Sequence, residues 1–191
     1  MRTTSDLSVR EVVENYVPRD SREEKDKQQM LRFIDSFDDV LTRDNTLGHF
    51  TASSFIVDKN KTKMLAIYHT IGNGWAHPGG HADGEKDFLS VAVREAKEET
   101  GLDVNVLDER PFLLSVNPVS GHMKKGVFVP SHLHFDVFYL MEADDTAPLV
   151  FRKDESKGVK WIPFDDLDNE QIANSMRPVV ERLINSLKVL K

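Results

Sequence analysis

Residues 79–102 read GGHADGEKDFLSVAVREAKEETGL, and this stretch is the most informative part of the chain. A glycine pair precedes a carboxylate-rich segment that we expect to be helical over 87–100. In such a helix Glu95, Glu98 and Glu99 fall at i, i+3 and i+4, so they share one sector of its surface. Their repulsion costs roughly a few tenths of a kcal/mol per pair. Because a hard divalent cation with oxygen ligands would offset it, the stretch predicts a metal site.

The same helix carries an apolar side that would pack on a sheet. It consists of small and aliphatic residues: Leu89, Ala92, Val93 and Ala96. The small side chains let the helix lie close to the sheet, which holds the carboxylates on a rigid element. An exposed, ion-paired surface is the ordinary interpretation of a glutamate-rich helix. The spacing back to Gly80 favours the metal site instead.

The pattern resembles the signature of the Nudix hydrolase (MutT-like) superfamily, G-x5-E-x7-R-E-U-x-E-E-x-G-U, in which U is a bulky aliphatic residue. The matching residues are Gly80, Arg94, Glu95, Glu98, Glu99, Gly101 and Leu102. Two positions depart from the signature: Lys86 replaces the isolated glutamate, with Glu85 just before it, and Ala96 replaces the larger aliphatic residue. The segments GHFTASS, WAHPGGHAD and HLHFD extend the likeness to a bacterial subgroup with an N-terminal helical extension.

The resemblance implies roles for particular residues. The ligands of Mg2+ or Mn2+ would be the Gly80 carbonyl and the side chains of Glu95, Glu98 and Glu99. The general base would be Glu98, Glu99 or Glu155, which precedes the last strand; Glu155 is otherwise an ordinary loop charge or a structural acid. Arg94 is placed to pair with Glu98 at i+4 and orient it. Glu85 would supply the missing carboxylate only through a shifted loop.

The remaining pattern predicts an α/β protein, and the resemblance implies a Nudix-type α/β/α sandwich with a mixed sheet covered by helices. Apolar residues at helical spacing from Met30 to Leu41 predict an N-terminal amphipathic helix after a polar stretch. Strands are expected at 50–57, 63–69, 103–116, 132–141 and 159–162, and a closing helix of about 15 residues after Ser175. We expect one compact domain, with residues 1–45 as a helical extension packed on a domain at 46–191.

Several histidines are candidates for substrate contact. His132, His134 and Asp136 alternate, so on a strand they share one face and would line a cleft. Two histidines at i and i+2 can also bind Zn2+, and half-exposed edge histidines are an equally simple interpretation. His81 would contact a phosphate or hydrogen-bond its own loop. We expect His49 to be a structural histidine at the start of a strand.

Composition limits the function. A net charge of −7 argues against broad binding to nucleic acid, although a bound cation would let an acidic cleft accept a small anion. The absence of cysteine excludes disulfides and thiol catalysis, including the mechanism of isopentenyl diphosphate isomerase, another superfamily member. We find no apolar run that would serve as a signal or membrane segment, so we expect a cytoplasmic protein.

The function predicted by the resemblance is metal-dependent hydrolysis of a diphosphate bond, by attack of water at phosphorus. The substrate would be a small nucleoside diphosphate linked to another moiety, such as a nucleoside triphosphate or ADP-ribose. Lys124, in an expected loop at 117–131, would meet a terminal phosphate, or is simply solvated. The alternative function is a catalytically weak nucleotide-binding or sensor module, which Lys86 keeps open. A homodimer is possible.

Overall fold

The computed structural model describes residues 7–69, 73–124, 126–151, 156–174 and 176–189. Its centre is an eight-stranded sheet in which five strands follow the order β10-β2-β1-β9-β5, while β3, β4 and β6 pair with β2, β1 and β9. The strands of this sheet are β1 (Gly48–Val57), β2 (Lys63–His69), β3 (Gly74–Ala76), β4 (Gly79–His81), β5 (Asn105–Val106), β6 (Leu113–Val119), β9 (His132–Glu142) and β10 (Ser156–Pro163). The sheet is mixed because β1 and β9 are parallel, whereas the other pairs are antiparallel.

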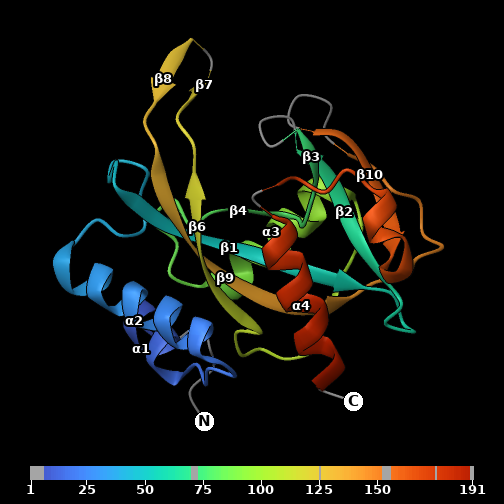
Figure 1. Cartoon of the computed structure of the whole chain (residues 1–191), viewed down its shortest axis with the longest axis horizontal. Helices are drawn as coiled ribbons and strands as arrows, with labels where there is room; N and C mark the ends of the chain where they lie inside the picture. The colour runs from blue at the N-terminus through green and yellow to red at the C-terminus, as the bar shows by residue number, and fades with distance from the viewer. Residues whose placement is uncertain (1–6, 70–72, 125, 152–155, 175, 190–191) are drawn as a thin grey trace.

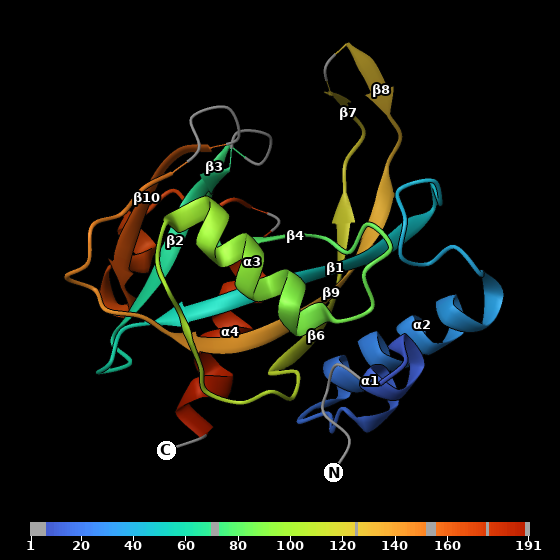
Figure 2. The ribbon, with the colours of Figure 1, turned by 180° about the vertical axis from the view of Figure 1, so that it is seen from behind.

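Helices cover both faces of the sheet. The helix α4 (Arg177–Val189) lies in front of the sheet in Figure 1, and α3 (Phe88–Thr100) lies in front of it in Figure 2, which shows the molecule from behind. Alternate residues of β1 point into two separate cores. Phe50 belongs to the core with α3, and Phe55 belongs to the core with α4. The predicted α/β/α arrangement is confirmed.

The carboxylate-bearing helix is present, as its sequence predicts. The side chain of Asp87 accepts a hydrogen bond from the Ser90 N–H and caps the start of α3. Gly101 ends the helix with φ of 75°, a left-handed conformation that glycine adopts without strain. Ala92 and Ala96 are fully buried, which brings α3 close to the sheet.

The strands predicted at 50–57 and 63–69 are also confirmed, and they form a hairpin of β1 and β2 with Val57 opposite Met64. Other boundaries differ from the predictions. The expected strand at 103–116 is divided between β5 and β6, and the expected loop at 117–131 instead contains a hairpin of β7 (His122–Lys124) and β8 (Val127–Val129). A 3₁₀ helix at Phe164–Asn169 follows β10. Ser175, the expected cap of the last helix, lies outside the described residues.

The N-terminal part forms two helices, α1 (Val9–Asn15) and α2 (Ser21–Ser36). The predicted single helix from Met30 to Leu41 is therefore wrong at both ends. The polar stretch before Met30 is helical because Asp20 caps α2 by accepting from the Glu23 N–H. Most of its charges lie on the exposed side of the helix, whereas Glu23 is buried.

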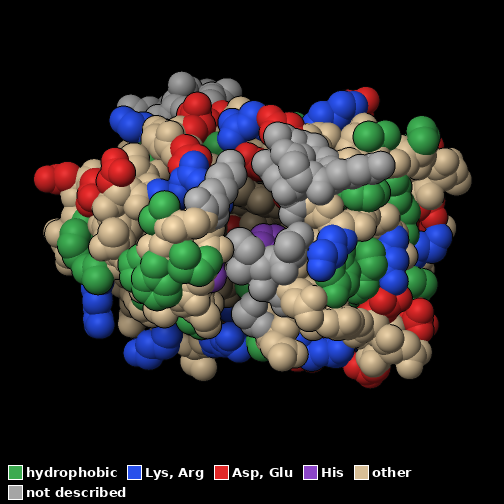
Figure 3. Space-filling model, turned by 90° about the horizontal axis from the view of Figure 1, so that it is seen from above, with side chains coloured by type: hydrophobic (Ala, Val, Ile, Leu, Met, Phe, Trp, Pro, Cys, Tyr) green, Lys and Arg blue, Asp and Glu red, His purple; other side chains and the backbone are tan. Residues whose placement is uncertain are grey.

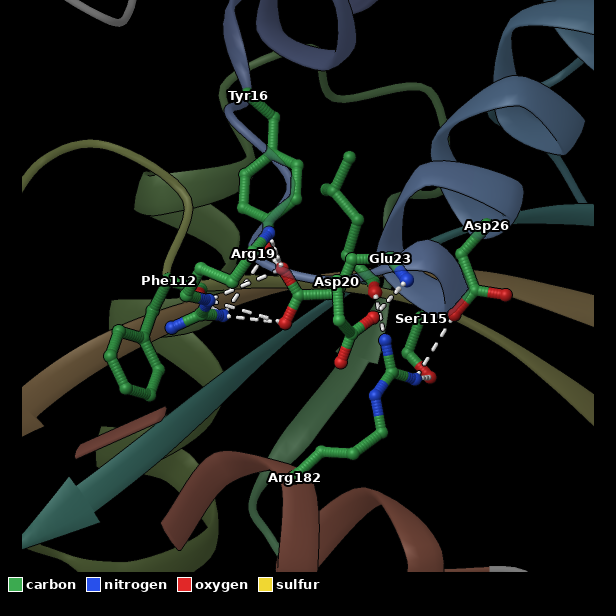
Figure 4. Close-up of polar contacts among 9 residues, drawn as sticks. Tyr16, Arg19, Asp20, Glu23, Asp26, Phe112, Ser115 and Arg182 are labelled. Carbon is green, nitrogen blue, oxygen red and sulfur yellow. Dashed lines mark hydrogen bonds and ion pairs between the residues drawn. The ribbon is translucent and has the colours of Figure 1, made fainter. Parts of the chain in front are cut away.

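Buried polar contacts attach these helices to the sheet and to α4 (Figure 4). Arg19 forms an ion pair with buried Glu23, at 3.0 Å, and also donates to the backbone carbonyl of Phe112. Arg182 of α4 pairs with Asp26 of α2 at 3.0 Å, and both side chains are largely buried. The pair of Arg182 and Asp26 joins residues that are 156 positions apart in the sequence. The N-terminal helices are therefore part of the tertiary structure.

Within the described part of the chain, no helix has the length and apolar character required to cross a membrane.

Candidate functional site

The glutamates of α3 lie against the glycine pair of β4. The backbone N–H of Gly79 donates to Glu99 Oε2 at 2.9 Å. A Cβ atom at Gly80 would stand 2.4 Å from the carboxylate carbon of Glu95, which is closer than real Cβ contacts. Glycine at this position therefore lets the Glu95 carboxylate rest directly on the β4 backbone.

Arg94 contacts the same group of carboxylates. Its Nη2 atom lies 3.2 Å from Glu95 Oε1, whereas its Nε atom lies 3.9 Å from Glu98 Oε1. The predicted i, i+4 pair with Glu98 is present, but the contact with Glu95 is shorter. Arg94 thus neutralises part of the repulsion within the group and holds the Glu95 carboxylate in place.

The three glutamates do not converge tightly on one point. In the part of the chain that the structure describes, they do not form a group of three ligand atoms within 4.8 Å of one another. The side chain of Glu98 is 44% exposed and that of Glu95 is 21% exposed. Because each carboxylate ends a flexible side chain, a shared ion would require these side chains to reorient.

The position of the missing motif glutamate is occupied by an exposed lysine, Lys86. The neighbouring Glu85 does not point toward α3 as a substitute. Its Oε1 atom accepts hydrogen bonds from the backbone N–H groups of Lys86, at 2.9 Å, and Asp87, at 3.1 Å. Glu85 therefore stabilises the turn before the helix.

Four histidines from three strands lie together on the side of β4 opposite the glutamates. The parallel register of β1 and β9 sets His49 opposite His134. The ring of His49 lies 5.0 Å from the rings of His132 and His134, and 5.1 Å from that of His81. The Nε2 atoms of His132 and His134 are 3.2 Å apart. The predicted candidates His81, His132 and His134 are thus brought together.

The sequence did not indicate that His49 belongs to this group of histidines. His49 is 4% exposed, and neither ring nitrogen has a hydrogen-bond partner among the described residues. Its position beside Gly48 predicts only the start of a strand. The pairing with His134 depends on a contact between strands far apart in the sequence, which no local pattern indicates.

Burial keeps His49, His81 and His134 uncharged near neutral pH. Loss of solvation, followed by the charge of neighbouring histidines, lowers the pKa of His81 and of His134 to about 3. Burial also lowers the pKa of His49, although the backbone of Asn45 opposes this change in part. Neutral imidazoles offer lone pairs and single N–H donors, but no positive charge to a phosphate.

Further polar side chains are buried beside the cluster on β1 and β9. The Ser53 hydroxyl donates to Asp136 Oδ2 at 3.0 Å, and His77 Nε2 lies 3.6 Å from the same oxygen. Asp136 shares the face of His132 and His134, as the alternation predicts. Seen from above, the molecule has a hollow in which histidine side chains are visible (Figure 3).

Lys124 and Glu155 are the remaining predicted residues. Lys124 is exposed at the end of β7, on the hairpin rather than in a loop, and its charge contributes to the lowered pKa of His81. Glu155, the candidate base on a distant segment, lies outside the described residues.

Known proteins resemble most of this chain. The model of the NUDIX domain matches residues 48–183. A curated relative, the CMP-5'-(N-acetyl-N-hydroxy-3-aminopropyl)phosphonate hydrolase of Streptomyces rubellomurinus, is 28% identical over 119 residues, which cover 60% of this chain and 52% of the relative. The chain thus matches about half the length of that relative.

Solved structures share the fold. A hydrolase of the NUDIX family from Clostridium perfringens is 26% identical and has a TM-score of 0.52, covering 75% of this chain and 98% of that one. An Ap4A hydrolase of C. elegans, solved as a binary complex, is 18% identical with a TM-score of 0.53, covering 74% and 96%. The two structures agree with the fold, and the family model spans the segment around Gly80 that carries the resemblance. The chain belongs to the NUDIX family.

Proposed function

We propose that this protein hydrolyses a diphosphate bond in a small nucleotide, in which a nucleoside diphosphate is linked to another moiety, and that it does so with Mg2+ or Mn2+. The observation that carries the proposal is the contact of the α3 glutamates with the glycine pair of β4. The relatives support the substrate class, because one is named for a CMP-linked phosphonate and another for Ap4A.

The residues at this site fit a hard divalent cation. Glu95, Glu98 and Glu99 supply carboxylate oxygens on one sector of a helix, and oxygen is the ligand atom that Mg2+ prefers. The absence of a side chain at Gly80 leaves its backbone beside the Glu95 carboxylate. We therefore assign the metal ligands to Gly80, Glu95, Glu98 and Glu99.

The bound ion supplies neutralisation and orientation of the diphosphate oxygens, which otherwise repel an attacking water. The protein's own residues supply the rest. Glu98 or Glu99 accepts the proton of the attacking water, and Glu155 stays a candidate for the same role. Arg94 holds the Glu95 carboxylate, and the Gly79 N–H holds Glu99.

Recognition of the substrate is assigned to the histidine cluster and to the β7–β8 hairpin. His81, His132 and His134 offer hydrogen bonds from three neighbouring positions of the sheet, and Lys124 brings a positive charge on the hairpin. The net charge of −7 disfavours nucleic acid as a partner. A homodimer stays a prediction.

The test is a substrate panel with a matched variant. We would measure release of phosphate, pyrophosphate or AMP from nucleoside triphosphates, ADP-ribose, NADH, diadenosine polyphosphates and nucleotide sugars, with Mg2+, with Mn2+ and with EDTA. We expect metal-dependent turnover of one class. Glu98→Gln, which keeps the size of the side chain and removes its charge, should lower turnover by at least about 10²-fold with an unchanged melting temperature. Near-native turnover of this variant would contradict the site.

A second candidate function is a binding or sensor module that retains the metal but hydrolyses poorly. It is favoured by Lys86 at the motif position and by the engagement of Glu85 with the local backbone. In that case no compound of the panel is cleaved, while one of them raises the melting temperature when metal is present. The variant Lys86→Glu, which restores the motif, would then be expected to gain turnover.

A further inference from the structure

We propose that His49, His132 and His134 form a second metal site, which binds Zn2+ or a similar borderline divalent ion and is separate from the glutamates of α3. The three residues come from the neighbouring parallel strands β1 and β9 and offer one ring nitrogen each within 4.8 Å of one another. Imidazole suits Zn2+, whereas Mg2+ prefers oxygen. The proposal does not depend on the hydrolytic function, and where it holds it replaces direct contact of His132 and His134 with the substrate.

The spacing of the nitrogens matches ligands of one ion. Two ligands at Zn–N distances of 2.0–2.1 Å in a tetrahedral site are about 3.3 Å apart. The Nε2 atoms of His132 and His134 are 3.2 Å apart. The three ring nitrogens all lie within 4.8 Å of one another. To reach the spacing of ligands on one ion, any two of them need to approach by at most about 1.5 Å. Small rotations of the rings provide such a movement.

The tautomer of His132 is set for metal binding. Its Nδ1 atom lies 2.8 Å from the backbone carbonyl of Pro130. Because a carbonyl only accepts, this contact requires a proton on Nδ1, and the Nδ1–H tautomer has its Nε2 lone pair on the side of His134. A backbone carbonyl bound to the outer nitrogen is the usual way in which proteins orient a histidine ligand.

A simple hydrogen bond does not account for the cluster. If His134 donates to the Nε2 lone pair of His132, two rings are satisfied, but His49 is not. His49 is 4% exposed, and neither ring nitrogen meets the geometry of a hydrogen bond in the described part of the chain, although the Asn45 backbone lies near enough to raise the pKa of His49. Leaving such a buried polar group unpaired is destabilising. An ion among the three rings gives His49 a partner.

The site is distinct from the glutamates because successive residues of a strand point to opposite faces. On β4, a Cβ atom at Gly80 would contact Glu95, whereas the ring of the next residue, His81, lies 5.1 Å from the rings of His49 and His134. His81 therefore stands beside the proposed site as its nearest additional ligand. If His81 does not bind the ion, the three histidines occupy three of its four tetrahedral positions. The fourth position is then open to water or another ligand.

The test uses full-length protein without a histidine tag, freed of metal by a chelator. We would titrate it with Zn2+ against a chromophoric chelator in excess Mg2+, and in parallel with Co2+, whose visible absorption reports tetrahedral coordination. The expected result is one equivalent of tightly bound Zn2+ that Mg2+ does not displace, and a tetrahedral Co2+ spectrum. Absence of that spectrum from the wild type would overturn the proposal without any variant.

Variants locate the ion. His132→Gln should weaken Zn2+ binding by at least about 10²-fold, since losing only an orienting partner commonly costs 10–100-fold. His122→Gln is the matched control, because the Nδ1 atom of His122 also contacts the carbonyl two residues earlier, Ser120, at 3.0 Å, outside the cluster. It should leave binding unchanged. If Glu98→Gln removes the bound Zn2+ while His132→Gln does not, the ion belongs to the glutamates and the histidine site is rejected.

Discussion

Two glycines determine how closely the carboxylates of α3 approach β4. At Gly79 an added Cβ would stand 2.3 Å from Ser53 Oγ and 2.9 Å from the backbone oxygen of Ala52. At Gly80 the three atoms nearest to it all belong to the side chain of Glu95. Substitution at the first position must therefore disturb the sheet itself. Substitution at the second can be accommodated by moving one flexible carboxylate, which separates an effect on the site from an effect on the fold.

We predict that Gly80→Ala lowers turnover and metal affinity by about tenfold or more, because it displaces a ligand from its position. The free energy of unfolding should change by less than about 1 kcal/mol, since the end of the Glu95 side chain can move aside. Urea denaturation and metal titration measure the two effects separately. The control is Gly158→Ala, where the nearest atom to the new Cβ is Trp75 Cη2 at 3.5 Å, an ordinary contact. Equal loss of metal affinity in both variants would contradict the assignment.

At the residue scale, the sequence revealed the glutamates more fully than the histidines. Glu95, Glu98 and Glu99 lie within one turn of one helix, so local periodicity alone places them together. The histidine cluster depends on the parallel register of β1 and β9, which pairs His49 with His134 across eighty-five positions. Alternation along one strand predicts that His132 and His134 share a face, but it carries no information about the neighbouring strand.

At the scale of elements, the turn between β1 and β2 depends on one buried carboxylate. Asp58 accepts hydrogen bonds from the backbone N–H groups of Thr62 and Lys63, both at 2.7 Å, and from the Asn60 N–H at 3.2 Å. Burial by itself raises the pKa of Asp58, but these hydrogen bonds outweigh it, and the net pKa is lowered. The ionised form of Asp58 is therefore the one that stabilises the hairpin.

We predict that Asp58→Asn lowers the free energy of unfolding at pH 7 by about 2 kcal/mol, because charged acceptors are replaced by a weaker one. The folded-state pKa lies below the unfolded value of about 3.9. The contribution of Asp58 is thus complete above that pH and is lost as the pH falls through the folded-state pKa. The difference between wild type and variant should shrink in urea denaturation curves below about pH 4. A difference that stays constant down to pH 2.5 would contradict this role; exposed Asp165→Asn is the control.

The elements that the sequence predicted well have their own local signals. α3 has a cap at Asp87 and a stop at Gly101, and the β1–β2 hairpin has a polar turn between two apolar runs. α1 is seven residues long and lacked enough turns to establish a period. The β7–β8 hairpin is exposed, so its strands show no alternation between buried and solvated residues. Burial of Val9, Val12 and Val13 decided α1, whereas the exposed hairpin is held by the pairing of its own two strands.

At the scale of the whole molecule, we propose that residues 1–45 are an extension that folds together with the domain at 46–191. Phe33 of α2 stacks on Phe135 of β9, with ring centroids 4.2 Å apart. The buried pair of Asp26 and Arg182 connects α2 to α4, and removal of one partner of such a pair costs about 3–5 kcal/mol. The core that contains α3 also contains buried residues of α1 and α2. An N-terminal unit that unfolds separately would expose this shared core.

The corresponding prediction is a single unfolding transition seen by probes in both parts. Both tryptophans, Trp75 and Trp161, lie in strands of the sheet, so their fluorescence reports the domain. Because the chain has no cysteine, Lys25→Cys on the exposed side of α2 provides one specific site for a fluorescent label. The two urea midpoints should coincide, since cooperative unfolding requires it. A label transition at lower urea, with the tryptophan transition unchanged, would instead show that the extension is an independent unit docked on a self-sufficient domain.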